Sequence, residues 1–92
     1  MVDPAHSLEN FYMTSYFDDQ VRKTIGRQIR NLRIELGLSQ EELAFRVGID
    51  RTYIGRIERG IANPKASLIY RMAYELKVEP AEIYVPIDEK PD

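Results

Sequence analysis

The chain has 92 residues, 43% hydrophobic and 30% charged, with a formal net charge of −2 at pH 7. This length suits one small domain, and the absence of cysteine excludes disulfide bonds, a thiolate nucleophile and a cysteine zinc site. No apolar stretch approaches the roughly 18 residues of a membrane span and no secretory signal is visible, so we expect no membrane partner.

Residues 1–18 form an N-terminal extension that is too apolar for an ordinary disordered tail. Its large apolar residues are Leu8, Phe11, Tyr12, Met13, Tyr16 and Phe17. Leu8, Phe11 and Tyr12 have the spacing of residues on one face of a short helix. His6 has neither a cysteine nor a second histidine with which to bind a metal, and we expect it at the surface.

From Asp19 to Leu36, apolar residues recur every three or four positions, which predicts a helix with one buried face. These residues are Val21, Ile25, Ile29, Leu32 and Leu36. We expect Asp18 or Asp19 to cap the start of this helix and Gly37 to end it.

Residues 37–60, GLSQEELAFRVGIDRTYIGRIERG, predict two short helices joined by a glycine turn. Ser39 and Glu42 form the sequence pattern of a capping box at the start of the first helix. Gly48 suits the left-handed conformation that ends this helix, and Asp50 is a good N-cap for the second. Isolated helices shorter than about 12 residues are marginal in water, so the pair needs the preceding helix to cover its apolar side.

A fourth helix is predicted from about Ala66 to Leu76, after a turn marked by Asn63 and Pro64. Its inward residues are Ile69, Met72, Ala73 and Leu76. Pro80 suits the first position of a short fifth helix over Pro80–Tyr84.

No segment alternates with period two for long enough to predict a strand. We therefore predict an all-α fold, a compact five-helix domain at residues 19–86 that contains the helical pair at 39–60. The extension at 1–18 precedes this domain, and a short tail at 87–92 follows it.

Charge is segregated along the chain. Residues 20–65 contain ten Lys or Arg and five Asp or Glu, whereas residues 1–19 contain four acidic residues and no Lys or Arg. Residues 66–92 contain six acidic and three basic residues. Small helical proteins often have uneven charge without any functional reason. A basic central segment nevertheless favours a polyanionic partner, because neutralisation of phosphates supplies most non-specific affinity for nucleic acid.

Seven sequence pieces occur in a fixed order: IGRQIRNLR, GLSQEELA, VGI, YIGRIERG, the Asn63-Pro64 turn, RMAYEL and VEPAEIY. Together, from about Ile25 to Tyr84, they resemble the Cro and phage-repressor helix-turn-helix proteins, also called the xenobiotic-response-element (XRE) family. The YI…ERG helix on a bare helical domain is similar to the controller proteins of restriction-modification systems. The resemblance implies a lambda-repressor-like regulator of transcription in a bacterial cytoplasm, without cofactor, metal or small-molecule ligand.

The resemblance also implies that the second helix of the motif, at about 50–59, enters the major groove of double-stranded DNA. The family's base-contacting positions correspond here to Arg51, Thr52 and Arg56. Arginine can donate two hydrogen bonds to guanine O6 and N7, and threonine offers a hydroxyl and a methyl that can meet thymine. The alternative is that these residues only form a solvated helix face.

Contacts to the DNA backbone are expected from polar residues around the motif. Gln40 matches a family position whose side chain and amide meet a phosphate, and Ser39 lies at the same helix start, which suits an anion. The other candidates are Tyr53, Arg59, Asn63 and Lys65. Tyr53 could instead pack its ring on the domain.

Two structural pairings follow from the resemblance. Related phage repressors join the positions of Arg33 and Glu58 in a largely buried ion pair that links the first helix to the end of the recognition helix.

Family operators are usually near-palindromic, which implies a homodimer, and aromatic residues are enriched in interface cores. The interface candidates are Tyr70, Tyr74, Tyr84 and Ile87, whereas we expect Ile83 to close the core of the monomer.

Two features of the sequence leave alternatives open. Phe45 stands where the family commonly has a polar residue, and we hypothesise that the extension folds back onto Phe45 or across a dimer partner. Glu41 and Glu42 lie near where related activators touch RNA polymerase, but acids in a first helical turn are already favoured by the helix dipole.

Other classes of function are less consistent with the sequence. We expect no enzyme, because no glycine-rich phosphate loop and no nucleophile with a nearby base can be identified. An antitoxin-like or adaptor module that uses the same fold to bind proteins is the alternative to a DNA-binding regulator.

Overall fold

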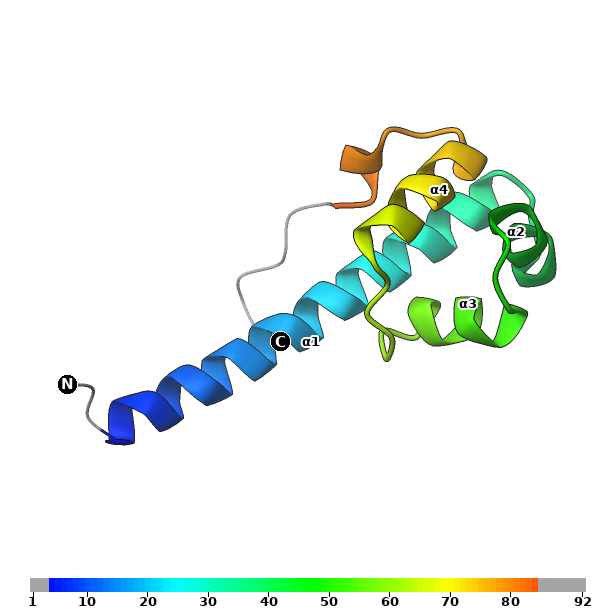
Figure 1. Cartoon of the computed structure of the whole chain (residues 1–92). Coiled ribbons are helices and arrows are strands. Elements are labelled where there is room, and N and C mark those ends of the chain that lie inside the picture. The colour runs from blue at the N-terminus through cyan, green and yellow to red at the C-terminus, as the bar shows by residue number, and fades with distance from the viewer. Residues whose placement is uncertain (1–3, 85–92) are drawn as a thin grey trace.

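The computed structural model describes the backbone of residues 4–84 and the side chains of residues 15–84. Its elements are the helices α1 (Pro4–Glu35), α2 (Gln40–Val47), α3 (Arg51–Glu58) and α4 (Ala66–Leu76), followed by the 3₁₀ turn η1 (Pro80–Glu82). Residues 4–84 contain no strand, and the all-α prediction is confirmed for them (Figure 1). None of their helices is both long and apolar enough to span a membrane.

The described residues form four α-helices rather than the predicted five. The segment predicted as a helix over Pro80–Tyr84 forms a single 3₁₀ turn, in which Glu82 N–H donates to Glu79 O and Ile83 N–H donates to Pro80 O. This turn is enough to place Ile83 in the core, where it is fully buried as predicted.

Helix α1 is much longer than the sequence pattern suggested. It starts at Pro4, so the prediction that Asp18 or Asp19 caps its start is wrong. Asp19 lies in the helix interior and forms ion pairs with Lys23 at 3.0 Å and Arg22 at 3.7 Å, pairs that support a continuous helix. The first half of α1 leads away from the other helices (Figure 1), including α2, the helix that contains Phe45.

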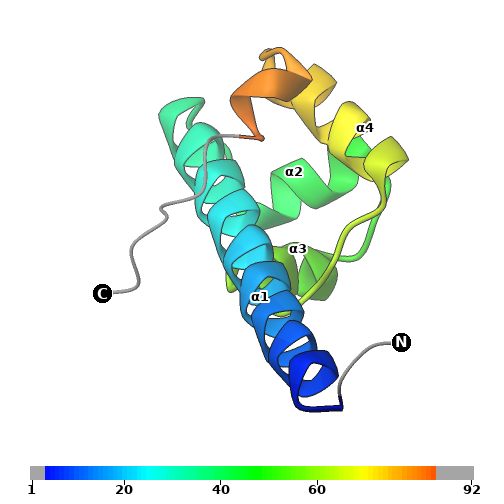
Figure 2. The same cartoon turned by 90° about the vertical axis from the view of Figure 1, so that its left-hand side faces the viewer.

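The core lies between α1 and the group formed by α2, α3 and α4, which lie largely to one side of α1 in Figure 2. Every helix contributes apolar side chains to it. The largest that are fully buried are Ile29, Leu43, Ile54, Ile57, Ile69, Met72 and Ile83.

The connection between α2 and α3 is fixed by the predicted caps. Ser39 Oγ accepts from Glu42 N–H at 3.0 Å, and Ser39 N–H donates to the Glu42 carboxylate at 3.1 Å. This bond from the Ser39 backbone is the main cause of the lowered pKa of Glu42. Gly48 ends α2 with φ of 83°, and Asp50 Oδ1 accepts from Thr52 N–H at 2.7 Å. The two helices therefore meet at a defined angle, joined by only three residues.

Gly26 allows α1 to cross directly over the end of α3. A Cβ atom at this position would lie 2.1 Å from the backbone oxygen of Ile57 and 3.0 Å from that of Glu58. Only glycine leaves room for such a close approach. The backbone oxygens cannot move aside without unwinding the end of α3.

We expect Gly26→Ala to lower the free energy of unfolding by about 1–3 kcal/mol, the usual cost of overpacking. Gly55→Ala is the matched control, because Gly55 is also a buried glycine within a helix. The nearest atom to its added Cβ would be the flexible Arg59 side chain, at 3.4 Å. That variant should keep or gain stability, by up to about 1 kcal/mol, because alanine is the better helix former. Urea unfolding of both variants measures the difference, and equal effects would contradict the role assigned to Gly26.

Candidate nucleic-acid interface

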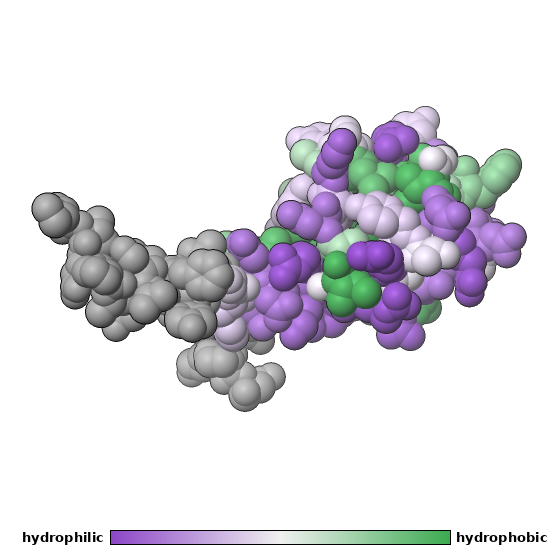
Figure 3. Space-filling model, turned by 60° about the horizontal axis from the view of Figure 1, so that its bottom comes forward, coloured by the Kyte–Doolittle hydropathy of each residue, from purple (hydrophilic) through white to green (hydrophobic). Residues whose placement is uncertain are grey.

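Helix α3 buries one face and exposes the other. Ile54 and Ile57 are fully buried, whereas Arg51, Thr52 and Arg56 are exposed. Figure 3 brings this side of the molecule forward; its lower part is largely hydrophilic around a hydrophobic patch, and more hydrophobic surface lies toward the upper right. The three residues predicted to contact bases therefore lie on a solvent-exposed helix face.

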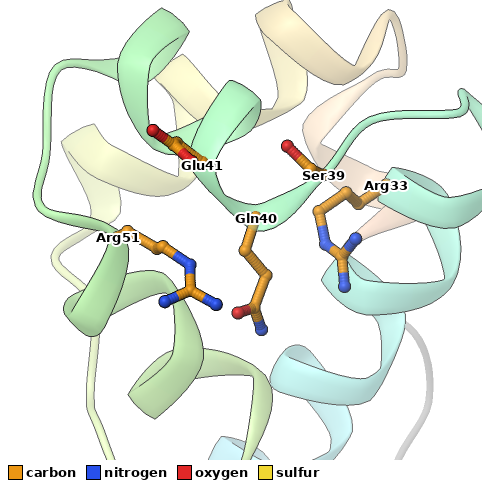
Figure 4. A pocket seen from close by; sticks show the side chains of 5 residues that line it. All are labelled: Arg33, Ser39, Gln40, Glu41 and Arg51. Atoms are coloured by element: carbon orange, nitrogen blue, oxygen red, sulfur yellow. The ribbon is translucent and has the colours of Figure 1, made fainter.

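A shallow hollow lies between the start of α2 and the start of α3. It is lined by Arg33, Ser39, Gln40, Glu41 and Arg51. The side chains of Gln40 and Arg51 extend into the space between the two helices, whereas that of Glu41 points away (Figure 4). Amides at a helix start and nearby guanidinium groups both favour an anion.

Arg33 and Glu58 are joined by two hydrogen bonds, from Arg33 Nε at 2.7 Å and from Arg33 Nη2 at 2.9 Å. Only 11% of the Arg33 side chain and 3% of the Glu58 side chain are exposed. These hydrogen bonds raise the pKa of Arg33 further. Both charges are paired with good geometry, as a buried ion pair requires.

The ion pair belongs to a larger network that the sequence pattern did not reveal. Gln40 Nε2 donates to Glu58 Oε1 at 3.1 Å, and Arg33 Nη1 donates to the backbone oxygen of Leu38 at 2.8 Å. One carboxylate thus connects the end of α1, the start of α2 and the end of α3. The Gln40 side chain is held within the hollow by the residue that ends α3.

The remaining residues predicted to contact phosphates differ in their surroundings. Tyr53 is half-buried and packs against the core, in line with the alternative for this residue. Arg59, Asn63 and Lys65 are exposed, and Lys65 is the N-cap of α4 without a side-chain capping bond. The structure therefore leaves these three side chains accessible around the end of α3 and the start of α4.

The tyrosines predicted for a dimer interface are exposed. Tyr74 is 81% exposed, Tyr70 62% and Tyr84 49%. Tyr70 and Tyr74 line a second hollow, between α2 and α4, together with Arg46, Val47, Arg71 and Glu75. Arg71 also donates to the backbone oxygen of Val47 at 3.1 Å. Ile87, the fourth interface candidate, lies outside the described residues.

A capped helix held by a tight turn against a second helix, whose exposed face carries arginines, defines a helix-turn-helix DNA-binding protein. A profile of the helix-turn-helix family matches residues 29–83, and the chain belongs to this family as a transcriptional regulator of the XRE and controller-protein kind. Regulators of this family are not enzymes.

Three relatives match this chain over most of their own length. The uncharacterized transcriptional regulator y4dJ of Sinorhizobium fredii is 39% identical over 77% of this chain and 92% of its own length. The restriction-modification controller protein C.AhdI of Aeromonas hydrophila is 43% identical, with a TM-score of 0.67 over 68% of this chain and 96% of its own. The controller protein C.Esp1396I, solved as a tetramer with its natural 35-base-pair operator, is 30% identical, with a TM-score of 0.63 over 70% of this chain and 84% of its own.

We expect Glu58→Ala to lower the free energy of unfolding by about 3–5 kcal/mol, because it leaves the Arg33 guanidinium buried without its carboxylate. DNA binding should be lost together with stability. Replacement of both partners, as in Arg33→Met with Glu58→Met, should cost less than the single change, because no buried charge remains. Thermal unfolding distinguishes the cases, and an unchanged melting temperature with lost DNA binding would contradict a structural role for the pair.

Proposed function

We propose that this protein is a sequence-specific regulator that binds a near-palindromic DNA operator as a homodimer, with α3 in the major groove. The observation that carries the proposal is the exposed face of α3, where Arg51 and Arg56 lie five residues apart on a helix fixed at both ends. A helix that served only as a solvent-exposed surface would not need to have both of its ends held in place.

Base recognition is assigned to the first turns of α3. Arg51 and Arg56 have the bidentate donors that match guanine O6 and N7, and Thr52 has the methyl that meets thymine. The Asp50 cap bond holds the start of α3, so these side chains project from a rigid base.

Phosphate contacts are assigned to the surface around α3. Ser39 and Gln40 lie in the hollow beside Arg51, and the Gln40 bond to Glu58 uses an amide hydrogen and leaves its oxygen and second hydrogen available. Arg59, Asn63 and Lys65 would contact the backbone beyond the far end of α3. Tyr53 can contribute its hydroxyl while its ring stays packed on the core.

The homodimer is assigned to α4 and the segment after it. Tyr70 and Tyr74 form an exposed aromatic pair one turn apart, and Tyr84 lies beyond η1. Ile87 completes the proposed set from the sequence. Two copies would then place their α3 helices about 34 Å apart, one turn of B-DNA.

Selection of bound sequences from a random DNA library, read at two salt concentrations, tests the proposed operator. We expect a palindrome with half-sites about one helical turn apart. Recovery of no sequence by a folded protein, with only weak salt-sensitive binding, would favour the antitoxin-like or adaptor module instead.

Binding of two variants to the selected operator distinguishes base contacts from phosphate contacts. Arg51→Ala should weaken binding by about 1–3 kcal/mol and relax the preference at one base position. Lys65→Ala should weaken binding to all sequences alike and reduce the salt slope by about one unit. An Arg51→Ala variant that keeps the wild-type preference would remove the base contact from the proposal.

We expect the protein to dimerise at micromolar concentration and Tyr74→Ala to weaken the dimer, because this side chain is the more exposed of the α4 pair. Lys77→Ala is a suitable control, since Lys77 is exposed just beyond the end of α4. Sedimentation equilibrium measures both, and a wild-type protein seen only as 10.7 kDa species would contradict the dimer.

A further inference from the structure

The outer side of α1 carries a stripe of exposed residues that the proposed DNA complex does not use. Its exposed members are Tyr16, Lys23, Arg27, Arg30 and Ile34. Their intervals of seven, four, three and four residues place them along one line of a helix. Asp19 is half-buried, pairs with Lys23 and lies on the same line between Tyr16 and Lys23. We call these six residues the α1 stripe.

The α1 stripe lies on the side of α1 that is turned away from Ile25 and Ile29, and at Lys23 it borders Gly60, where an added Cβ would lie 2.8 Å from Lys23 Cα. Ile25 and Ile29, which α1 buries against the other helices, are two residues away from members of the stripe and so face roughly the opposite direction. The stripe still contains two apolar side chains, since Tyr16 is 43% and Ile34 53% exposed. Exposed apolar groups that recur along one line of a helix are typical of a helix–helix contact.

The sign of the charge changes along α1. Residues 1–19 contain four acidic residues and no Lys or Arg, whereas residues 20–34 contain five basic residues and no acidic one. Two parallel copies of such a helix would bring like charges together. Two antiparallel copies bring the acidic, aromatic half of one helix against the basic half of the other, which is favourable.

We propose that α1 is a self-association element that pairs antiparallel with α1 of a second copy of this chain. In the register that pairs residues 16–27 of the two helices with each other, Tyr16 lies opposite the partner's Arg27, and Asp19 lies opposite the partner's Lys23. An arginine over a tyrosine ring makes a cation–π contact. The two-fold symmetry repeats each contact, so a small set of residues contributes twice.

The first half of α1 lies outside the part of the chain that matches the family profile. The profile begins at residue 29, and C.AhdI aligns over 96% of its own length but only 68% of this chain. The α1 contact is also separate from the tyrosines proposed for the dimer, which lie on α4 and beyond η1. A protein with both contacts would assemble beyond a dimer.

Sedimentation equilibrium of the full chain tests the α1 contact, with Tyr16→Ala and Phe17→Ala as a matched pair. Both residues are exposed aromatics of the same helical turn, but Phe17 lies about 100° around the helix from the α1 stripe. Tyr16→Ala should weaken one association step about 5- to 30-fold, the effect of losing two cation–π contacts. Phe17→Ala should leave that step unchanged. Equal effects of the two variants, or no effect of Tyr16→Ala, would overturn the proposal.

The same pair measured in a Tyr74→Ala background separates the α1 contact from the proposed α4 dimer. Association that persists in the Tyr74→Ala background and is lost on Tyr16→Ala comes from α1, even if Tyr74→Ala abolishes the α4 interface. Circular dichroism verifies that each variant keeps its helix content.

Engineered cysteines report the direction of pairing, since the natural chain has none. A mixture of Tyr16→Cys and Arg27→Cys chains should form a disulfide mainly between the two variants under mild oxidation. Two Tyr16→Cys chains paired antiparallel would hold their thiols about 16 Å apart along the helix axis, beyond the reach of a disulfide. Predominant linkage between two Tyr16→Cys chains would show a parallel pair, and no linkage would show that the α1 stripe stays free; both outcomes overturn the proposal.

Discussion

The ion pair between Arg33 and Glu58 is the contact on which the position of α3 depends. Its carboxylate ends α3, its guanidinium lies in the last turn of α1, and the same two groups hold Leu38 O and the Gln40 side chain at the start of α2. A buried ion pair contributes little net stability, because desolvation of the two charges offsets their attraction. What it does contribute is geometry, since the bonds form only when three helix ends are correctly placed.

Much of this arrangement could be predicted from local sequence. The capping box of Ser39 and Glu42, the Gly48 turn and the Asp50 cap are encoded within a few residues, and all three are present. The bounds of α4, Ala66–Leu76, also agree with the prediction. Such features depend on hydrogen bonds between near neighbours, so a short window of sequence is enough to specify them.

Other features depend on contacts between distant segments and could not be predicted from local patterns. Gly26 looks like a weak point in a helix, and only the crossing of α3 explains it. A glycine inside a helical pattern is a known sign of close packing, and it is the one signal that the sequence offers. The predicted start of α1 is wrong because Asp19 resembles a cap, whereas its carboxylate pairs with Lys23 along the helix. The bond from Gln40 to Glu58 joins residues 18 positions apart and has no sequence signature.

The fixation of α3 at both ends has a consequence for the duplex in the proposed complex. Asp50 holds the first turn, and the Gly26 crossing with the Glu58 network holds the last. A helix held at both ends tilts and unwinds less readily, which leaves more of the adjustment to the DNA. Steps that kink easily, such as TA and CA, then lower the cost of binding even where no side chain reaches them. Base pairs between the two half-sites would therefore contribute to the choice of operator through their stiffness, although α3 never touches them.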